Sequence, residues 1–281
     1  MTGPTPTVPV LRTRHLEIPR LGLGTWQMRD ATGRAAVEGA LAMGYRHLDT
    51  AEMYGNEAMV GAAMAASGIP RPEIFLTSKV WHDHLSPDAM RAACAASLER
   101  LRTPYLDLYL IHWPALGMDL GAVLGTLAEL REEGMTRAIG VANFPAGMLS
   151  EALATGVPLS CVQVEYHVNL RQDRLLALAA QHDLALTAYS PLGKGGLVDD
   201  PTLAAIGARH DASGAQVALA WLLRQERVVP IPKASRPETQ RANLLALDLA
   251  GRLSEQDLAE INGLPRDQRF VNPDFAPDWE A

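Results

Sequence analysis

The chain has 281 residues, of which 48% are apolar, 20% charged and 5% aromatic. This is the composition of an ordinary globular protein, and it excludes disordered and collagen-like chains. At about 150 residues per domain, the length allows one large domain or two small ones. Twenty-five Lys and Arg against 32 Asp and Glu give a net charge of −7, and no stretch is densely basic, so we expect no nucleic-acid partner.

Nothing in the sequence predicts insertion into a membrane or export. The longest apolar runs, such as 217–223, fall well short of the roughly 20 residues that a membrane-spanning helix requires. Residues 1–14 are rich in Thr and Pro and lack the basic start and apolar core of a signal peptide, so we expect a cytoplasmic protein. Cys94 and Cys161 are the only cysteines, and without CxxC spacing we expect both to be reduced core residues.

Short runs typical of β-strands recur along the chain with helical patterns between them. Eight strands are predicted, at 21–25, 47–50, 74–80, 106–112, 138–143, 162–166, 185–190 and 228–232. Apolar and small residues recur at three- and four-residue spacing between them, which predicts helices such as 88–101, 120–133, 171–182 and 216–224. Repeated alternation of strand and helix indicates a parallel sheet.

Two helix starts carry their own sequence signals. Ser86 precedes Pro87, a residue favoured at the first helical position, and Ser213 to Gln216 resembles a capping box. No linker divides the chain, so we expect a single domain over 1–281, with an N-terminal segment at 1–20 and a C-terminal tail at 265–281 near the substrate pocket.

Eight strands over about 250 residues match the size of a (β/α)8 TIM barrel. The alternative is an open doubly wound sheet, which would carry a glycine fingerprint after its first strand. Gly22 and Gly24 begin such a pattern, but Gln27 stands where the third glycine belongs. Phosphate-loop, HExxH and GxSxG motifs are also absent from the sequence, which disfavours the corresponding nucleotidases, metalloproteases and hydrolases.

In such a barrel, residues at the carboxyl ends of the strands form the active site. The polar residues predicted to lie there are Asp49, Lys79, His112, Asn143, Gln163, Tyr189 and Lys233, with Tyr54 in the loop five residues after Asp49. Together they suggest a proton-donating site, although a free tyrosine has a pKa of about 10 and is a weak acid.

We expect the Lys79 ammonium to lower the pKa of Tyr54, because an opposite charge in contact can lower a pKa by about 1 to 3. Asp49 would keep Lys79 charged and in place. Neutral His112 would orient a substrate carbonyl toward the Tyr54 phenol.

Eight segments, in order between Val10 and Trp279, resemble the aldo-keto reductase family. They are 22–26 (GLGTW), 44–57 (GYRHLDTA with YGNE), 77–81 (TSKVW), 107–114 (DLYLIHWP), 139–144 (IGVANF), 163–166 (QVEY), 188–193 (AYSPLG) and 231–233 (IPK). Within the family, the short C-terminus at 269–279 is most like bacterial 2,5-diketo-D-gluconate reductases of the B type.

The resemblance implies a (β/α)8 barrel that binds NADPH without a Rossmann fold and reduces an aldehyde or ketone to an alcohol. Asp49, Tyr54, Lys79 and His112 match the family's catalytic positions, with Tyr54 as the general acid. The substrate would contact Trp26, Tyr54, Trp81, His112 and Trp113. The implied cofactor contacts are Gly24, Thr25, Trp26, Asp49, His112, Asn143, Gln163, Tyr189, Ser190, Leu192, Gly193, Lys233, Ser235, Arg236 and Asn243.

Several positions depart from the family pattern. Ala142 replaces a serine near the carboxamide of the cofactor, and Ala234, Thr239 and Ala242 replace polar residues beyond Lys233. Lys233 and Arg236 still provide two cations for a 2′-phosphate, so we expect NADP(H) rather than NAD(H).

Two other functions are weighed against a carbonyl reductase. One is a nicotinamide-binding regulatory module with only vestigial reductase activity, which the full catalytic set disfavours. The other is a sugar hydrolase with paired carboxylates, for which only Asp49 and Glu165 stand at strand ends. We expect small carbonyls such as methylglyoxal or 2,5-diketo-D-gluconate as substrates, no bound metal, and a monomer.

Overall fold

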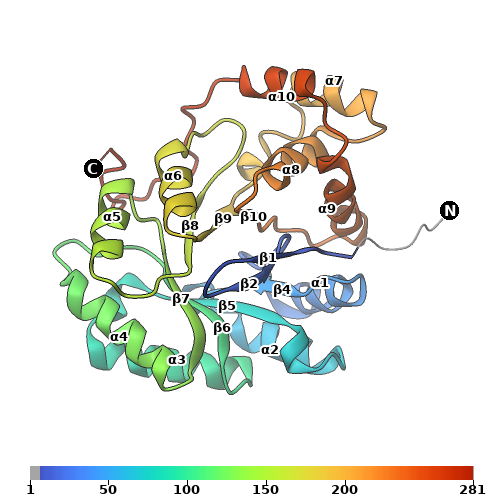
Figure 1. Ribbon diagram of the computed structural model, residues 1–281. Helices are drawn as coiled ribbons and strands as arrows, with labels where there is room; N and C mark the ends of the chain where they lie inside the picture. Colours follow the sequence, from blue (N-terminus) through green and yellow to red (C-terminus); the bar gives the residue numbers. More distant parts are fainter. Residues whose placement is uncertain (1–6, 281) are drawn as a thin grey trace.

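Eight parallel strands form the centre of the molecule and follow one another in chain order around the sheet (Figure 1). The computed structural model describes residues 7–280. The strands are β3 (Leu23–Gly24), β4 (His47–Asp49), β5 (Phe75–Val80), β6 (Leu106–Ile111), β7 (Thr136–Ala142), β8 (Cys161–Glu165), β9 (Ala185–Tyr189) and β10 (Val228–Pro230). The amides of Gly22 and Gly24 donate to the carbonyls of Pro230 and Pro232 at 3.1 and 3.2 Å, which closes the sheet into a barrel. The predicted (β/α)8 barrel is confirmed.

Helices surround the strands and connect them (Figure 1). The α-helices are α1 (Asp30–Ala42), α2 (Glu57–Ala66), α3 (Pro87–Leu101), α4 (Leu120–Glu132), α5 (Ala146–Ala154), α6 (Asp173–Gln181), α7 (Pro201–Arg209), α8 (Gly214–Arg224), α9 (Pro237–Ala250) and α10 (Glu255–Asn262). Four short 3-10 turns lie in the connections, namely η1 (Glu52–Tyr54), η2 (Arg71–Glu73), η3 (His82–His84) and η4 (Gly193–Gly195).

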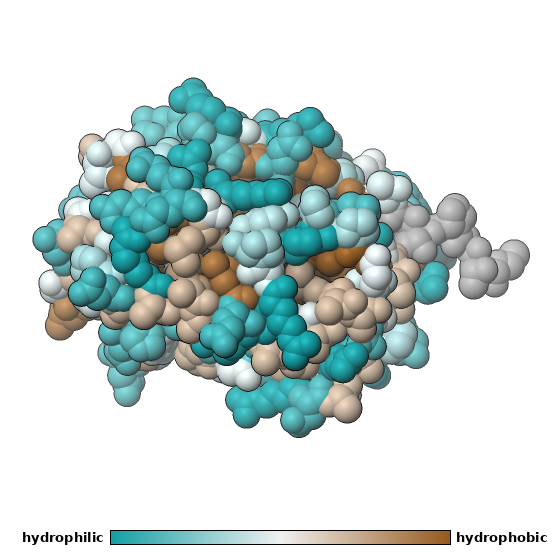
Figure 2. All heavy atoms as spheres, turned by 90° about the horizontal axis from the view of Figure 1, so that it is seen from below, coloured by the Kyte–Doolittle hydropathy of each residue, from teal (hydrophilic) through white to brown (hydrophobic). Residues whose placement is uncertain are grey.

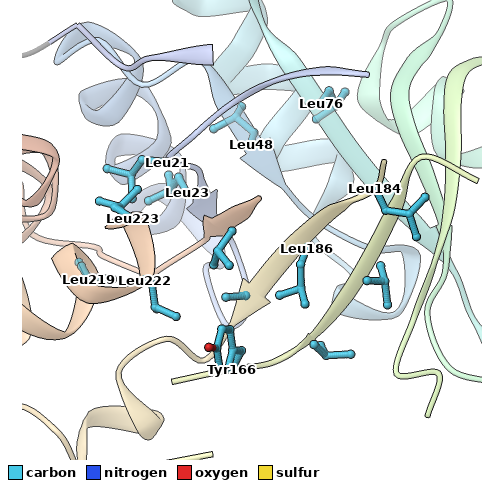
Figure 3. Packing of buried hydrophobic residues seen from close by; sticks show 14 of the residues in the cluster. Leu21, Leu23, Leu48, Leu76, Tyr166, Leu184, Leu186, Leu219, Leu222 and Leu223 are labelled. Atoms are coloured by element: carbon cyan, nitrogen blue, oxygen red, sulfur yellow. The ribbon is translucent and has the colours of Figure 1, made fainter. Parts of the chain in front are cut away.

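The larger part of the hydrophobic core lies between the strands and the helices. In Figure 3, Leu223 of α8 lies beside Leu21 and Leu23 at the first strand, and Leu219 and Leu222 lie elsewhere on the same helix; all five are buried. At about 25 cal/mol per Å² of buried apolar surface, packing of this kind supplies most of the stability of each helix. Cys94 and Cys161 are free and buried, as expected.

A hairpin that the sequence analysis did not predict covers one end of the barrel. It consists of β1 (Val10–Arg12) and β2 (Glu17–Pro19), paired antiparallel within the predicted N-terminal segment. Ile18 is fully buried and belongs to the same core cluster as Phe75, the first residue of β5. The hairpin therefore closes the end where the strands begin, and the site must lie at the opposite end.

The seam of the barrel leaves no space for a side chain at Gly24 of its first strand. A Cβ atom at Gly24 would lie 2.6 Å from the carbonyl oxygen of Ile231, so glycine is required there. This crowding accompanies a β3 of only two residues, shorter than the predicted strand 21–25.

The capping box at Ser213 and Gln216 is confirmed. Ser86 precedes Pro87 at the start of α3, but its side chain makes no capping hydrogen bond.

The surface shown in Figure 2 is largely hydrophilic, and hydrophobic residues appear there only in small separate areas. Between residues 7 and 280, none of the helices has the length and the apolar character that crossing a bilayer would demand.

The fold predicts a dependence of stability on pH through the buried His47 of β4. Burial lowers the pKa of His47 from 6.5 to about 4, so the folded state holds it neutral while the unfolded chain binds a proton below pH 6.5. We therefore expect full stability above pH 6.5 and a loss, as pH falls toward 4, of about tenfold in the folding equilibrium per pH unit for this group. Urea unfolding at several pH values measures that slope.

His47→Gln provides the matched variant, because it removes the titrating ring whatever its effect on absolute stability. The slope below pH 6.5 should become shallower by one proton. An unchanged slope would show that His47 is not the group responsible.

Candidate active site

The polar residues predicted at the strand ends converge at the open end of the barrel. Asp49 is the last residue of β4, Lys79 lies one residue before the end of β5, and His112 directly follows β6. Tyr54 ends the turn η1, five residues beyond Asp49. Because β4, β5 and β6 are neighbours in the sheet, these four residues lie side by side.

A buried ion pair joins the first two strands of this set. Lys79 Nζ lies 2.5 Å from Asp49 Oδ1 and donates a second hydrogen bond to the carbonyl of Thr50 at 2.8 Å. The Lys79 side chain is fully buried, and that of Asp49 is 2% exposed. Burial lowers the pKa of Lys79, and the charge of Asp49 opposes that shift. The carboxylate is therefore what favours a charged lysine inside the barrel.

The Tyr54 ring lies above this pair and is surrounded by aromatic side chains. Lys79 Nζ is 5.1 Å from the centre of the ring. The rings of Trp26 and His112 have their centres 4.8 and 5.5 Å from it. These contacts pack the Tyr54 ring against Trp26, His112 and the lysine of the ion pair.

The pKa of Tyr54 shifts in the direction opposite to the one expected from the sequence. Burial raises it well above 10, and the negative charge of Asp49 raises it further. The predicted net lowering of the Tyr54 pKa is therefore wrong for this arrangement, because burial of the phenol, together with the charge of Asp49, outweighs the influence of the lysine. The consequence is a phenol that keeps its proton at neutral pH.

His112 is neutral in this environment. Burial lowers its pKa well below 6.5, and the nearby Lys79 and His82 lower it further. Its Nδ1 atom is buried without a hydrogen-bond partner among residues 7–280. A neutral imidazole beside a protonated phenol provides two hydrogen-bonding groups for one carbonyl oxygen.

A hydrogen-bonded chain links the remaining strand ends to these residues. The Tyr189 hydroxyl, at the end of β9, donates to Asn143 Oδ1 at 2.7 Å, and Asn143 Nδ2 donates to the carbonyl of His112 at 2.9 Å. Gln163 of β8 donates from Nε2 to Asp49 Oδ2 at 2.8 Å. Asn143 has a φ of +62°, a strained conformation that asparagine tolerates better than most residues.

These groups border a cavity of about 750 Å³. Of the predicted site residues, those that line it are Gly24, Thr25, Trp26, Asp49, Tyr54, His112, Trp113, Asn143, Gln163, Tyr189, Ser190, Leu192 and Lys233. The predicted residues outside this lining are Lys79, Trp81, Gly193, Ser235, Arg236 and Asn243. Lys79 lies behind Asp49, and Trp81 packs against His112 with ring centres 5.1 Å apart.

The charged residues at one end of the cavity test whether it fits a nicotinamide dinucleotide. Lys233 lines the cavity, and Arg236 precedes the N-terminus of α9, where a phosphate is favoured. The residues present therefore fit the adenosine phosphate part of such a group.

The C-terminal tail closes one side of the cavity. Glu165, at the end of β8, accepts hydrogen bonds from the amides of Phe270 and Val271, both at 2.9 Å. Beyond this anchor, the Phe275 ring lies 5.5 Å from Trp113 between ring centres. Since Glu165 holds the tail, it is not the second free carboxylate that a sugar hydrolase would require.

Sequence reasoning missed several residues of the cavity. Met53 directly precedes the predicted site residue Tyr54, and Lys194 directly follows the predicted site residue Gly193 in a glycine-rich segment. Their places in the sequence could therefore have indicated that both line the cavity. Val271 belongs to the tail, whose path depends on tertiary contacts. The missed lining residues are Gln27, Met53, Pro191, Lys194, Gly195, Val198, Ile231, Pro232, Thr239 and Val271.

Comparison with known proteins adds independent information. A methylglyoxal reductase, DkgB, from Escherichia coli O157:H7 is 37% identical over 270 residues, which cover 94% of this chain and 100% of that protein. An aldo-keto reductase from Mycolicibacterium vanbaalenii is 42% identical over 255 residues, 90% of each chain. A crystal structure named as a 2,5-diketo-D-gluconic acid reductase B superposes with a TM-score of 0.94 at 39% identity over 98% of both chains.

The profile of the Aldo/keto reductase family matches residues 20–265, which include every strand of the barrel. The family profile, the relatives that match almost the whole chain and the barrel fold all indicate the same family. The chain is a member of the Aldo/keto reductase family.

Proposed function

We propose that the protein reduces aldehydes or ketones to alcohols with NADPH, and that Tyr54 is the general acid. The observation that carries this proposal is the convergence of the Tyr54 phenol, the His112 imidazole and the Asp49 carboxylate on one cavity wall, with the ammonium of Lys79 buried behind the carboxylate. Membership of the family supports an oxidoreductase that acts on carbonyls.

Each of the four residues has a distinct role in this proposal. His112 orients the carbonyl oxygen by a hydrogen bond, and Tyr54 donates the proton as negative charge develops on that oxygen. Lys79, kept charged by Asp49, favours the phenolate that remains after the proton has left. When bound, the nicotinamide dinucleotide supplies the hydride.

The remaining strand-end residues bind the cofactor in this proposal. Asn143 and Gln163 would hold the carboxamide of the nicotinamide, and the Tyr189 ring would stack on the nicotinamide. Ser190, Leu192 and Gly193 would follow the pyrophosphate. Lys233, Ser235 and Arg236 would surround the 2′-phosphate, and Asn243 would contact the adenosine. The left-handed φ of +46° at Ser190, a conformation that costs energy for a residue other than glycine, supports a functional role for this loop.

The substrate is proposed to be a small carbonyl compound. The relatives named methylglyoxal reductase and 2,5-diketo-D-gluconic acid reductase B suggest a dicarbonyl compound. Trp26 and Trp113 in the cavity lining also suit apolar aldehydes. We propose that the protein acts as a monomer in the cytoplasm.

Tyr54→Phe tests the proton donor. The variant keeps the ring contacts with Trp26 and His112 and loses only the hydroxyl, so we expect unchanged folding and NADPH affinity. Turnover should fall by about 10²- to 10⁴-fold, the typical contribution of general acid catalysis. The absorbance of NADPH during reduction of methylglyoxal and 4-nitrobenzaldehyde measures the rate, and fluorescence titration measures the affinity.

Tyr105→Phe is the matched control, because the Tyr105 hydroxyl is buried without a partner among the described residues and precedes β6 at the opposite end of the barrel. It should retain wild-type turnover. Wild-type turnover in Tyr54→Phe would refute the role of Tyr54. A wild-type kcat far below about 1 s⁻¹ on every carbonyl would instead favour the regulatory module.

Removing the two proposed phosphate contacts tests the cofactor. A hydrogen bond to a charged group contributes about 1.5 to 3 kcal/mol, so Lys233→Ala and Arg236→Ala should each raise the KM for NADPH by roughly 10- to 100-fold. The KM for NADH should hardly change. Arg241→Ala, exposed further along α9, is the control and should alter neither value. Equal effects on the two cofactors would contradict the assignment.

A further inference from the structure

Glu52 is a largely buried carboxylate that has no part in the proposed chemistry. It begins the turn η1, two residues before Tyr54, and its side chain is 10% exposed. Its Oε1 atom accepts a hydrogen bond from the backbone amide of Trp81 and lies 3.1 Å from Nδ1 of His84. Both partners belong to the segment after β5, so the carboxylate connects the loop after β4 to the loop after β5.

Other contacts also connect the same two strand ends. Lys79 pairs with Asp49 and donates to the carbonyl of Thr50, and the Thr50 amide donates to the carbonyl of Thr77 at 3.0 Å. Glu52 follows Asp49 by three residues and Trp81 follows Lys79 by two, so the Glu52 contact joins the same two chain segments as the ion pair, a few residues further on. Tyr54 belongs to the segment after β4. Trp81 belongs to the segment after β5, and the centre of its indole ring lies 5.1 Å from that of the His112 ring.

The backbone amides at the end of η1 make only local hydrogen bonds. The amides of Tyr54 and Gly55 donate only to carbonyls of the same turn, those of Ala51 and Glu52 at 3.1 Å. Short turns with local hydrogen bonds alone open easily. The side chain of Glu52 therefore ties this turn to the neighbouring strand end.

We propose that Glu52 is a positioning residue, which fixes the turn carrying Tyr54 against Trp81 so that the phenol and His112 face the same point. This inference rests on the proposed function, in which Tyr54 donates the proton. A displacement of about 1 Å at a reacting group can lower a rate by about 100-fold, so a tie of this kind affects turnover without touching the substrate.

Glu52→Ala and Glu52→Gln separate positioning from charge. Alanine removes the acceptor of the Trp81 amide, whereas the glutamine side chain retains an amide oxygen that can accept it. We expect kcat to fall about 10- to 100-fold in Glu52→Ala, with NADPH affinity unchanged. Glu52→Gln should restore kcat to within about threefold of the wild type, because one acceptor suffices for one amide.

Hydrogen exchange measured on the same proteins provides a readout that does not require activity. In Glu52→Ala, the amides of Trp81, Tyr54 and Gly55 should exchange faster than in the wild type, and in Glu52→Gln they should stay protected. Asp119→Ala is the control. Asp119 likewise accepts a backbone amide, that of Ala122 at 3.0 Å, in a loop at the same end of the barrel. Its loss should change neither kcat nor exchange at Trp81.

The outcomes distinguish the inference from the function on which it rests. Wild-type kcat in Glu52→Ala, or unchanged exchange at Trp81, would overturn the positioning role. If the wild type reduces no carbonyl, the proposed function fails, and exchange alone decides whether Glu52 holds the turn. Slow turnover in Glu52→Ala with rescue by glutamine supports the inference.

Discussion

The buried ion pair between Lys79 and Asp49 is the interaction on which the active-site end of the barrel depends. A lysine without exposed surface favours the neutral form unless a carboxylate adjoins it, and here the two atoms are 2.5 Å apart. The second oxygen of Asp49 accepts from Gln163, so the same carboxylate connects β4 to strands on both sides of the cavity. The position of Tyr54 above the lysine follows from this arrangement.

The closed barrel explains why one end carries the chemistry. The hairpin β1–β2 fills the end where the strands begin, and Ile18 is fully buried there. At the other end, the strands terminate in polar side chains, and Glu165 anchors the tail that brings Phe275 beside Trp113. A buried phenol with a raised pKa holds its proton until a stronger base forms, which suits reduction of a carbonyl better than hydrolysis.

The parallel barrel and the strand-end residues could be predicted because short β-like runs alternate with helical patterns and polar residues stand at or just beyond the carboxyl ends of several runs, as at Asp49 and His112. The hairpin could not, since three-residue strands within 10–19 acquire their burial only from contacts with the barrel. The direction of the Tyr54 pKa shift was also inaccessible, because it depends first on the burial of the phenol in the folded barrel and then on the nearby charge of Asp49. Cavity residues of the tail, such as Val271, depend on the anchor at Glu165.

The stability of single and double variants of the ion pair tests this account most directly. Urea unfolding at pH 7 should show Lys79→Met destabilised by roughly 3 to 5 kcal/mol, because Asp49 is left charged and buried without its partner. Lys79→Met combined with Asp49→Asn should recover much of that loss, since no buried charge then remains. Wild-type stability in Lys79→Met, or a double variant that is less stable than the single one, would contradict the central place of the pair.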